Sequence, residues 1–246
     1  ILVADLYLEA VIPPDPNANV VSGTIPVDAV WRAALSPYFV AGTVTVTAGA
    51  TLTIEPGVTV GIAPGASLLV DRGRLLAEGT EAQPIRFEPH THGSSWSQIA
   101  IRDSPLESRI AWAVIDGAAT RGNVQGENTA LHLDHVTFTN TNVQLVTVDN
   151  TSVVLQHCVF PSIQNDELVH FLTMPADGHA LIASNWFGTT TGYNDIIDFT
   201  GGNRPGPVAC FLGNVFTAGV DDCFDMDGCD AHIEGNLFLN VREDAD

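Results

Sequence analysis

Two acidic phrases in the last quarter of the sequence contain the residues best suited to chemistry. They read NDIID (194–198) and DDCFDMD (221–227), and they lie 27 residues apart. Their carboxylates belong to Asp195, Asp198, Asp221, Asp222, Asp225 and Asp227. If the chain repeats at this interval, Asp195 lies against Asp222 and Asp198 against Asp225. Alternate residues of a strand share a face, so Phe224 and Met226 should point inward and the aspartates outward.

Carboxylates one strand spacing apart repel one another at a protein surface. The repulsion is relieved if some of them protonate or if a hard cation lies between them. Calcium takes six to eight oxygen ligands in flexible geometry, and aspartate clusters suit it. The phrases therefore predict a calcium site. A solvated acidic face and a set of catalytic carboxylates are the two alternatives.

Three further residues are candidates for substrate binding. Trp186 and Tyr193 lie close to the first acidic phrase, and an outward aromatic ring beside a cation site suits a sugar ring. Each of them could equally cover apolar surface beneath a loop. Arg204 lies in one of two expected loops, near residues 201–207 and 172–177, that should project beside the acidic phrases.

Two histidines, His135 and His157, occur 22 residues apart, at the same position of the expected repeat. They should stack on one another, with His132 nearby. Neutral imidazoles are metal ligands, so a metal site is one interpretation. A stack of surface histidines without a metal is the other.

The element that must position these residues is an internal repeat marked by the pattern x-N-x-F. Its aromatic positions recur at intervals of 22 to 29 residues and are Phe138, Phe160, Phe187, Phe216 and Phe238. A unit this short holds about three strands and cannot bury its own apolar face, so the units must stack with parallel strands about 4.8 Å apart. We expect the phenylalanines to form an internal ladder. We expect Asn185, Asn214 and Asn236 to form an amide ladder at a turn.

The first half of the sequence indicates the same architecture. From Thr43, short runs of alternating apolar residues are separated by glycine and proline, which is typical of strands and turns. The stretch 27–35 is short and amphipathic and predicts a helix that caps the first coil. We therefore expect an all-β chain, a right-handed parallel β-helix (solenoid) over 39–246, preceded by an N-terminal extension and cap over 1–38. The sequence reads as a piece of a longer protein.

Several phrases resemble a known superfamily. The phrases TLTIEPGVTV (51–60), GRLLAEGT (73–80) and PIRF (84–87) resemble the opening coils of pectate-lyase-like parallel β-helices. The phrases GTTTGYNDIIDF (188–199), RPGP (204–207) and DAHIEGN (230–236) resemble β-helix regions of bacterial surface proteins that carry spore-coat-type kinase (CotH) or lamin-tail modules. This resemblance covers roughly residues 23–246. It implies a fold and little about activity, because many functions share this scaffold.

Two enzyme families resemble the second acidic phrase. DDCFD (221–225) is similar to the Asp-Asp-Gly-x-Asp calcium motif of family 9 pectate lyases, with Asp198 as the carboxylate one coil earlier. Those enzymes use a lysine as the base, and this sequence has no lysine. Arg204 or Arg242 would have to act as the base instead, although the pKa of an arginine side chain is above about 12. VDDC (220–223) also resembles the Gly-Asp-Asp-Cys phrase of polygalacturonases, but their following Gly-His-Gly and Arg-Ile-Lys phrases are missing.

Composition limits the partners. The chain of 246 residues has 29 acidic and 9 basic residues and a net charge of −20, which should repel nucleic acid and anionic membranes. No apolar stretch reaches the roughly 18 to 20 residues of a membrane helix. Of the four cysteines, Cys223 and Cys229 would form a disulfide in an oxidising compartment; buried free thiols are the alternative.

The sequence as a whole favours a calcium-binding extracellular or cell-surface module for structural display or carbohydrate binding. An acidic polysaccharide is the expected partner, and self-association through the ends of the β-helix is a further expectation. A calcium-dependent polysaccharide lyase is the main alternative, ahead of a polygalacturonase-like hydrolase.

Overall fold

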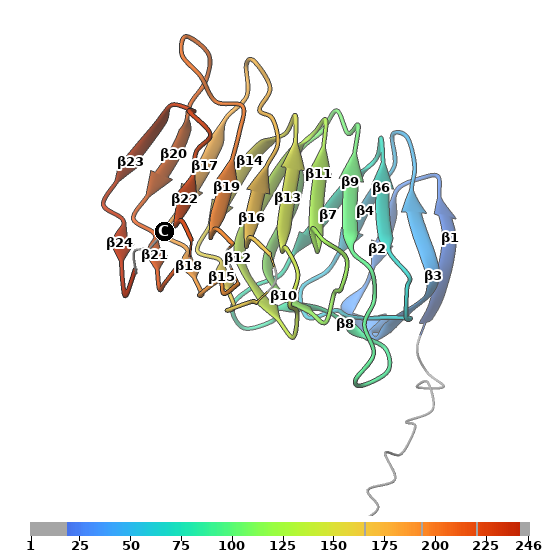
Figure 1. Ribbon diagram of the computed structural model, residues 1–246. Helices are drawn as coiled ribbons and strands as arrows, with labels where there is room; N and C mark the ends of the chain where they lie inside the picture. The colour runs from blue at the N-terminus through green and yellow to red at the C-terminus, as the bar shows by residue number, and fades with distance from the viewer. Residues whose placement is uncertain (1–18, 165, 193, 220, 242–246) are drawn as a thin grey trace, which may run out of the picture.

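The protein is a parallel β-solenoid of about nine coils with almost no helix. The computed structural model describes residues 19–241 apart from 165, 193 and 220. Among these residues, each of the 24 strands pairs in parallel with the strand one coil earlier or later. Figure 1 shows the coils side by side, from the first at one end of the molecule to the last at the other.

The strands form three columns, and each coil contributes one strand segment to each column. Column 1 contains β5 (Thr59–Ile62), β8 (Ile85–Pro89), β15 (Val159–Phe160), β18 (Trp186–Phe187), β21 (Val215–Phe216) and β24 (Leu237–Phe238). Column 2 contains β6 (Leu68–Asp71), β9 (Ile99–Arg102), β11 (Val124–Glu127), β13 (Val146–Asp149), β16 (Val169–Phe171), β19 (Ile197–Phe199) and β22 (Phe224–Asp225). Column 3 contains β2 (Ala29–Trp31), β4 (Thr51–Ile54), β7 (Arg74–Glu78), β14 (Ser152–Gln156), β17 (Ala180–Ala183), β20 (Ala209–Leu212) and β23 (Ala231–Glu234).

Four longer strands turn a corner and belong to two columns each. β1 (Asn19–Ile25) and β3 (Tyr38–Val46) run from column 1 into column 2. β10 (Ser108–Asp116) and β12 (Ala130–Thr139) run from column 3 into column 1. The corners need a left-handed backbone, which is uncommon outside glycine. Between columns 3 and 1 it occurs at Trp112, His135, His157, Ser184, Gly213 and Gly235.

The interior is filled by the ladder of aromatic rings that the repeat predicts. Consecutive rings stack with centroids 4.6–5.2 Å apart from Phe138 to Phe238. Phe187 and Phe216 are fully buried, whereas Phe238 in the last coil is 42% exposed. The ladder is therefore confirmed. It extends from β12 to β24 and fixes the register of column 1.

The predicted asparagine ladder is also confirmed. Asn185 donates from Nδ2 to Oδ1 of Asn214 (3.0 Å), and Asn214 donates likewise to Asn236 (2.9 Å). A second ladder, which the repeat pattern did not indicate, lies at the corner between columns 2 and 3. There Asn150 donates to Asn128 (2.8 Å), which donates to Asp103 (3.0 Å). These amide ladders satisfy polar groups at the turns of successive coils.

The N-terminal part differs from the sequence-based prediction. The helix expected over 27–35 is wrong, because only residues Ala33–Leu35 form a short 3-10 turn (η1) and Ala29–Trp31 is strand β2. Trp31 is buried and stacks on Tyr38 with centroids 5.1 Å apart, and β2 pairs with β4. Tertiary packing thus overrides an amphipathic pattern that suits a helix. Strands β1 and β2, within the range 1–38 expected as extension and cap, already belong to the solenoid, and residues 1–18 of that range lie outside the described residues.

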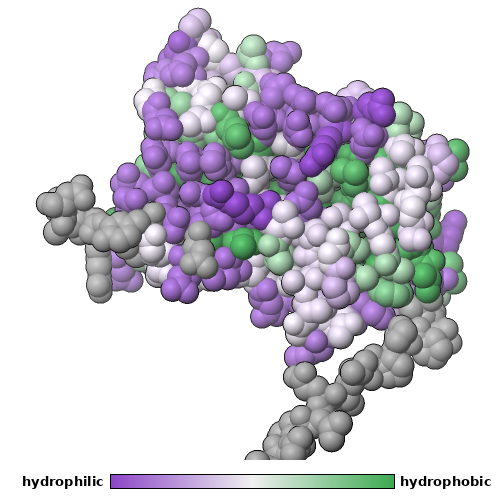
Figure 2. All heavy atoms as spheres, turned by 45° about the vertical axis from the view of Figure 1, so that its right-hand side comes forward, coloured by the Kyte–Doolittle hydropathy of each residue, from purple (hydrophilic) through white to green (hydrophobic). Residues whose placement is uncertain are grey.

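Two loops project from the corner between columns 2 and 3 (Figure 1), as the long repeat intervals predict. They span residues 172–179, between β16 and β17, and 200–208, between β19 and β20. Figure 2 shows hydrophilic residues gathered over one part of the face in view, next to a paler area with scattered hydrophobic residues. Within the described part of the chain, no helix is long and apolar enough to cross a membrane.

Candidate functional site

The first part of the acidic site lies at the corner between columns 1 and 2 of the last coils. Asp195 precedes β19, and Asp221 and Asp222 precede β22 at the same corner one coil later. One carboxylate oxygen from each of these residues lies within 4.8 Å of the others. The backbone N–H of Asp222 donates to Oδ1 of Asp195 (3.0 Å), which confirms that these two residues are neighbours.

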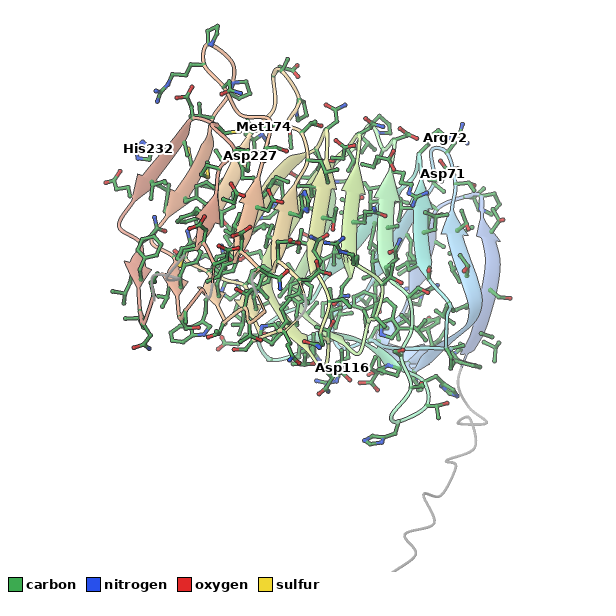
Figure 3. The ribbon with its side chains drawn as sticks, viewed as in Figure 1. Asp71, Arg72, Asp116, Met174, Asp227 and His232 are labelled. Atoms are coloured by element: carbon green, nitrogen blue, oxygen red, sulfur yellow. The ribbon has the colours of Figure 1, made fainter. Side chains whose placement is uncertain are left out.

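The second part of the site lies on the outer face of column 2. Asp198 of β19 is in register with Asp225 of β22, as predicted. Met226 packs against the core, and the N–H of Asp227 donates to Oδ1 of Asp225 (3.1 Å). Figure 3 shows Asp227 among the last coils, far from Asp71 and Arg72 near the first. The six predicted aspartates thus form two adjoining groups, one at a corner and one on a strand face.

The electrostatics of the site favour a cation. Partial burial, together with the charges of Asp225, Asp221 and Asp222, raises the pKa of Asp195 to about 6, against the lowering effect of the hydrogen bond from Asp222. Partial burial also raises the pKa of Asp198 and, with smaller contributions from Asp225 and Asp227, outweighs the opposing effect of His170. Oδ1 of Asp198 is buried and has no hydrogen-bond partner among the described residues. Asp195 and Asp198 therefore ionise less readily than free aspartates do.

Column 2 adds two residues that the sequence-based prediction missed. His170 of β16 is in register with Asp198, and its Nε2 lies 3.5 Å from Oδ2 of that residue. Its Nδ1 lies 4.0 Å from Glu167, whose carboxylate accepts a hydrogen bond from Gln144 (2.7 Å) and pairs with Arg121 (3.2 Å). An alignment carried back by one coil from Asp198 would have identified His170. The acidic outer face of column 2 therefore continues, one coil earlier, into the half-buried polar residues His170 and Glu167.

Two of the three residues predicted to bind a substrate, Trp186 and Arg204, lie on different parts of the coil. Trp186 lies on the outer face of column 1, 47% exposed, between Val159 and Val215 of the adjacent strands. Arg204 lies in the loop 200–208, where it pairs with Asp230: its guanidinium is 3.7 Å from Oδ1, and its N–H donates to Oδ2 (2.8 Å). Tyr193 lies outside the described residues. The contacts of Arg204 thus give no support to a role as a catalytic base.

The two histidines at equivalent positions of the repeat lie next to each other. His135 and His157 stack with ring centroids 4.5 Å apart, as predicted. His132 lies outside this stack; its Nδ1 contacts Arg109 (3.0 Å).

All four cysteines carry free thiols, so the alternative of a Cys223–Cys229 disulfide is not adopted. Burial raises the pKa of Cys158 to about 12, which makes that thiol inert.

Comparison of the chain with models of protein families, with curated proteins and with solved structures gives no match. The class that the fold defines is the parallel β-solenoid, and the likeness to β-helix proteins stands at the level of architecture. Because a scaffold of this kind supports many functions, function has to be argued from the site.

Proposed function

We propose that this chain is a calcium-binding β-solenoid module that acts outside the cell, in structural display or carbohydrate binding. The observation that carries the proposal is the corner cluster, where carboxylate oxygens of Asp195, Asp221 and Asp222 lie within 4.8 Å of one another. Partial burial and the charges of the neighbouring aspartates raise the pKa of Asp195, and a divalent cation would offset both effects by stabilising the ionised carboxylate.

The chemistry of the donors favours calcium over a transition metal. The corner cluster offers only oxygen ligands, and its carboxylates are exposed or half-buried, so water molecules can complete a shell of six to eight ligands. Magnesium demands near-ideal octahedral geometry and gives up its water reluctantly. The cluster sits on two successive turns, which differ in length and allow the flexible arrangement that calcium tolerates.

Carbohydrate recognition is the role we infer for the surface beside the cluster. Trp186 presents a half-exposed ring flanked by the exposed Val159 and by Val215, a flat apolar strip of the kind on which sugar rings stack. An acidic polysaccharide would also bridge through calcium to the aspartates. The last coil exposes three large apolar side chains, Ile233, Leu237 and Phe238. Self-association through that end of the solenoid therefore remains a prediction.

A calcium-dependent lyase has weaker support. The sequence has no lysine to abstract a proton, and Arg204 is paired with Asp230. His170 lies beside Asp198, but its two ring nitrogens already face the carboxylates of Glu167 and Asp198, at 4.0 and 3.5 Å. We therefore place the function in binding.

A thermal melt in EDTA, and again across a calcium titration at fixed ionic strength, tests the proposal. An ion that binds only the native state raises the midpoint, by about 2.7 kcal/mol of stability at 100 times its dissociation constant. Asp222→Asn should reduce this shift strongly, and Asp225→Asn should reduce it less. Glu81→Gln removes the same charge from an exposed position away from the cluster and should keep the full shift.

The proposal fails if calcium and magnesium shift the midpoint equally, or if Asp222→Asn responds as Glu81→Gln does. Either result would leave the acidic face as a solvated surface.

A further inference from the structure

A second cluster, which contains two histidines as well as an aspartate, lies at the corner between columns 3 and 1. It consists of Asp134 at the end of the column 3 part of β12, His135 beside it, and His157 one coil later. Both histidines have a left-handed backbone, with φ of 54° each, so their side chains leave the corner in the same direction. Their rings stack at 4.5 Å, and Trp112, one coil earlier, stacks on the other face of His135 at 3.8 Å.

The three residues converge on one point. Nδ1 of His135 lies 2.7 Å from Oδ1 of Asp134, and Nδ1 of His157 lies 2.9 Å from the same oxygen. Because a carboxylate can only accept, both rings donate their Nδ1–H to it. All three potential ligand atoms lie within 4.8 Å of one another. Two nitrogens and one oxygen from adjacent turns thus face a common centre.

The surroundings hold this arrangement in a state suited to a metal. Partial burial acts to raise the pKa of Asp134, but hydrogen bonds from His157, Gln156 and His135 outweigh it, and the net pKa is lowered. The carboxylate is therefore ionised at neutral pH. The side chains of His135 and His157 remain 33% and 46% exposed, so solvent and an ion can reach them. The Trp112 ring restricts rotation of His135.

We propose that Asp134, His135 and His157 form a binding site for a borderline divalent transition-metal ion, with zinc as its reference ligand. Two imidazole nitrogens and one carboxylate oxygen are a ligand set that zinc accepts with a solvent molecule in the fourth position. Calcium prefers oxygen ligands alone, so this site and the aspartate corner select different ions. On metal binding each neutral ring carries its proton on Nε2 instead of Nδ1.

The geometry needs only a small adjustment. Zinc–nitrogen and zinc–oxygen bonds of about 2.0–2.2 Å in a tetrahedron place the ligand atoms roughly 3.3 Å apart. The hydrogen-bonded separations of 2.7 and 2.9 Å are shorter, so the Asp134 carboxylate withdraws by about half an ångström when the ion replaces the shared protons. A carboxylate at a strand end can make this movement by rotation of its side chain.

Isothermal titration of zinc chloride into the chelator-treated protein, in a large excess of calcium, tests the proposal. Calcium saturates the oxygen-only sites and isolates the nitrogen-containing one. We expect one zinc per chain and at least about a tenfold loss of affinity in His157→Asn and in Asp134→Asn. Asparagine tolerates the left-handed backbone at position 157, and it keeps a hydrogen-bond acceptor at position 134. Cobalt bound at the same site should give a visible absorption band that both variants lose.

His232→Gln is the matched control, because His232 also pairs with a carboxylate (Glu234, 2.8 Å) but has no second imidazole in that pair. It should bind zinc as tightly as the unchanged protein. Far-UV circular dichroism in chelator establishes that each variant folds. The proposal is overturned if the folded His157→Asn variant binds zinc as tightly as the unchanged protein, or if the unchanged protein takes up no stoichiometric zinc.

Discussion

At the scale of single residues, the ionisation of Asp195 connects the acidic corner to stability. Its pKa in the folded protein is about 6, above the ordinary value of 3.8. The folded state therefore binds this proton more tightly than the unfolded state. The resulting stabilisation is present below pH 3.8 and is lost as the pH rises through about 6. Calcium has the opposite dependence, because it binds the ionised carboxylate.

Asp195→Asn separates these two effects. Asparagine keeps an oxygen that accepts the N–H of Asp222, and it cannot ionise. In EDTA, the midpoint of the variant should rise relative to that of the unchanged protein as the pH increases from 4 to 6.5, and then level off. In saturating calcium the order should reverse at neutral pH. Thermal melts across pH, with and without calcium, measure both effects. A difference in midpoint between the two proteins in EDTA that stays constant from pH 4 to 6.5 would contradict the assignment of the raised pKa to Asp195.

A second residue-scale prediction concerns Asn214 in the amide ladder. Its Oδ1 accepts from the backbone N–H and from Nδ2 of Asn185, and its Nδ2 donates to the carbonyl of Ile182 and to Asn236. Asn214→Ala leaves several of these buried groups unpaired, so we expect a loss of about 3 kcal/mol or more in the free energy of unfolding. Urea unfolding measures it. The exposed Asn203→Ala is the control and should change stability by less than about 0.5 kcal/mol.

At the scale of elements, the phenylalanine ladder sets the register of column 1. Phe187 lies in the middle of the ladder and is fully buried, whereas Phe238 at its end is 42% exposed. Phe187→Ala should cost about 3–5 kcal/mol, because the truncation opens a cavity between two stacked rings. Phe238→Ala should cost clearly less, since one face of its ring has no ladder partner among the described residues. Equal losses of unfolding free energy in the two variants, measured in urea, would mean that stacking within the ladder does not determine the stability of the core.

The same elements show what the sequence can predict. The x-N-x-F repeat predicted the phenylalanine and asparagine ladders, and the 27-residue interval between the acidic phrases predicted the pairing of Asp198 with Asp225, because residues one coil apart must meet in a stacked structure. The first coil was mispredicted, since periodicity in the short stretch 27–35 cannot separate a strand with a buried Trp31 from an amphipathic helix. His170 was missed because the alignment of the two acidic phrases was not carried back by one coil from Asp198. Arg204 lies in the expected loop, but its pairing with Asp230 could not be predicted, because only the folded loop brings the two residues together.

At the scale of the whole molecule, charge and architecture act together. A net charge of −20 with nine arginines leaves most carboxylates without a cationic partner, so the coils repel one another at low ionic strength. The parallel solenoid concentrates this effect, because it brings like residues of successive coils into register. Histidine and asparagine ladders gain from that register, whereas aspartates in register need a cation. Specific ions at two corners would therefore stabilise the same stack that the repeat creates.

The most direct test of this account is a calorimetric titration of calcium into the metal-free protein at fixed ionic strength, compared with Asp222→Asn. We expect a saturable calcium site in the unchanged protein that is much weaker for magnesium and that is lost or strongly weakened in the variant. Saturable binding of equal strength in both proteins would place calcium elsewhere. Heats that calcium and magnesium produce alike, without saturation, would contradict the central claim and leave the aspartates as a screened, solvated face.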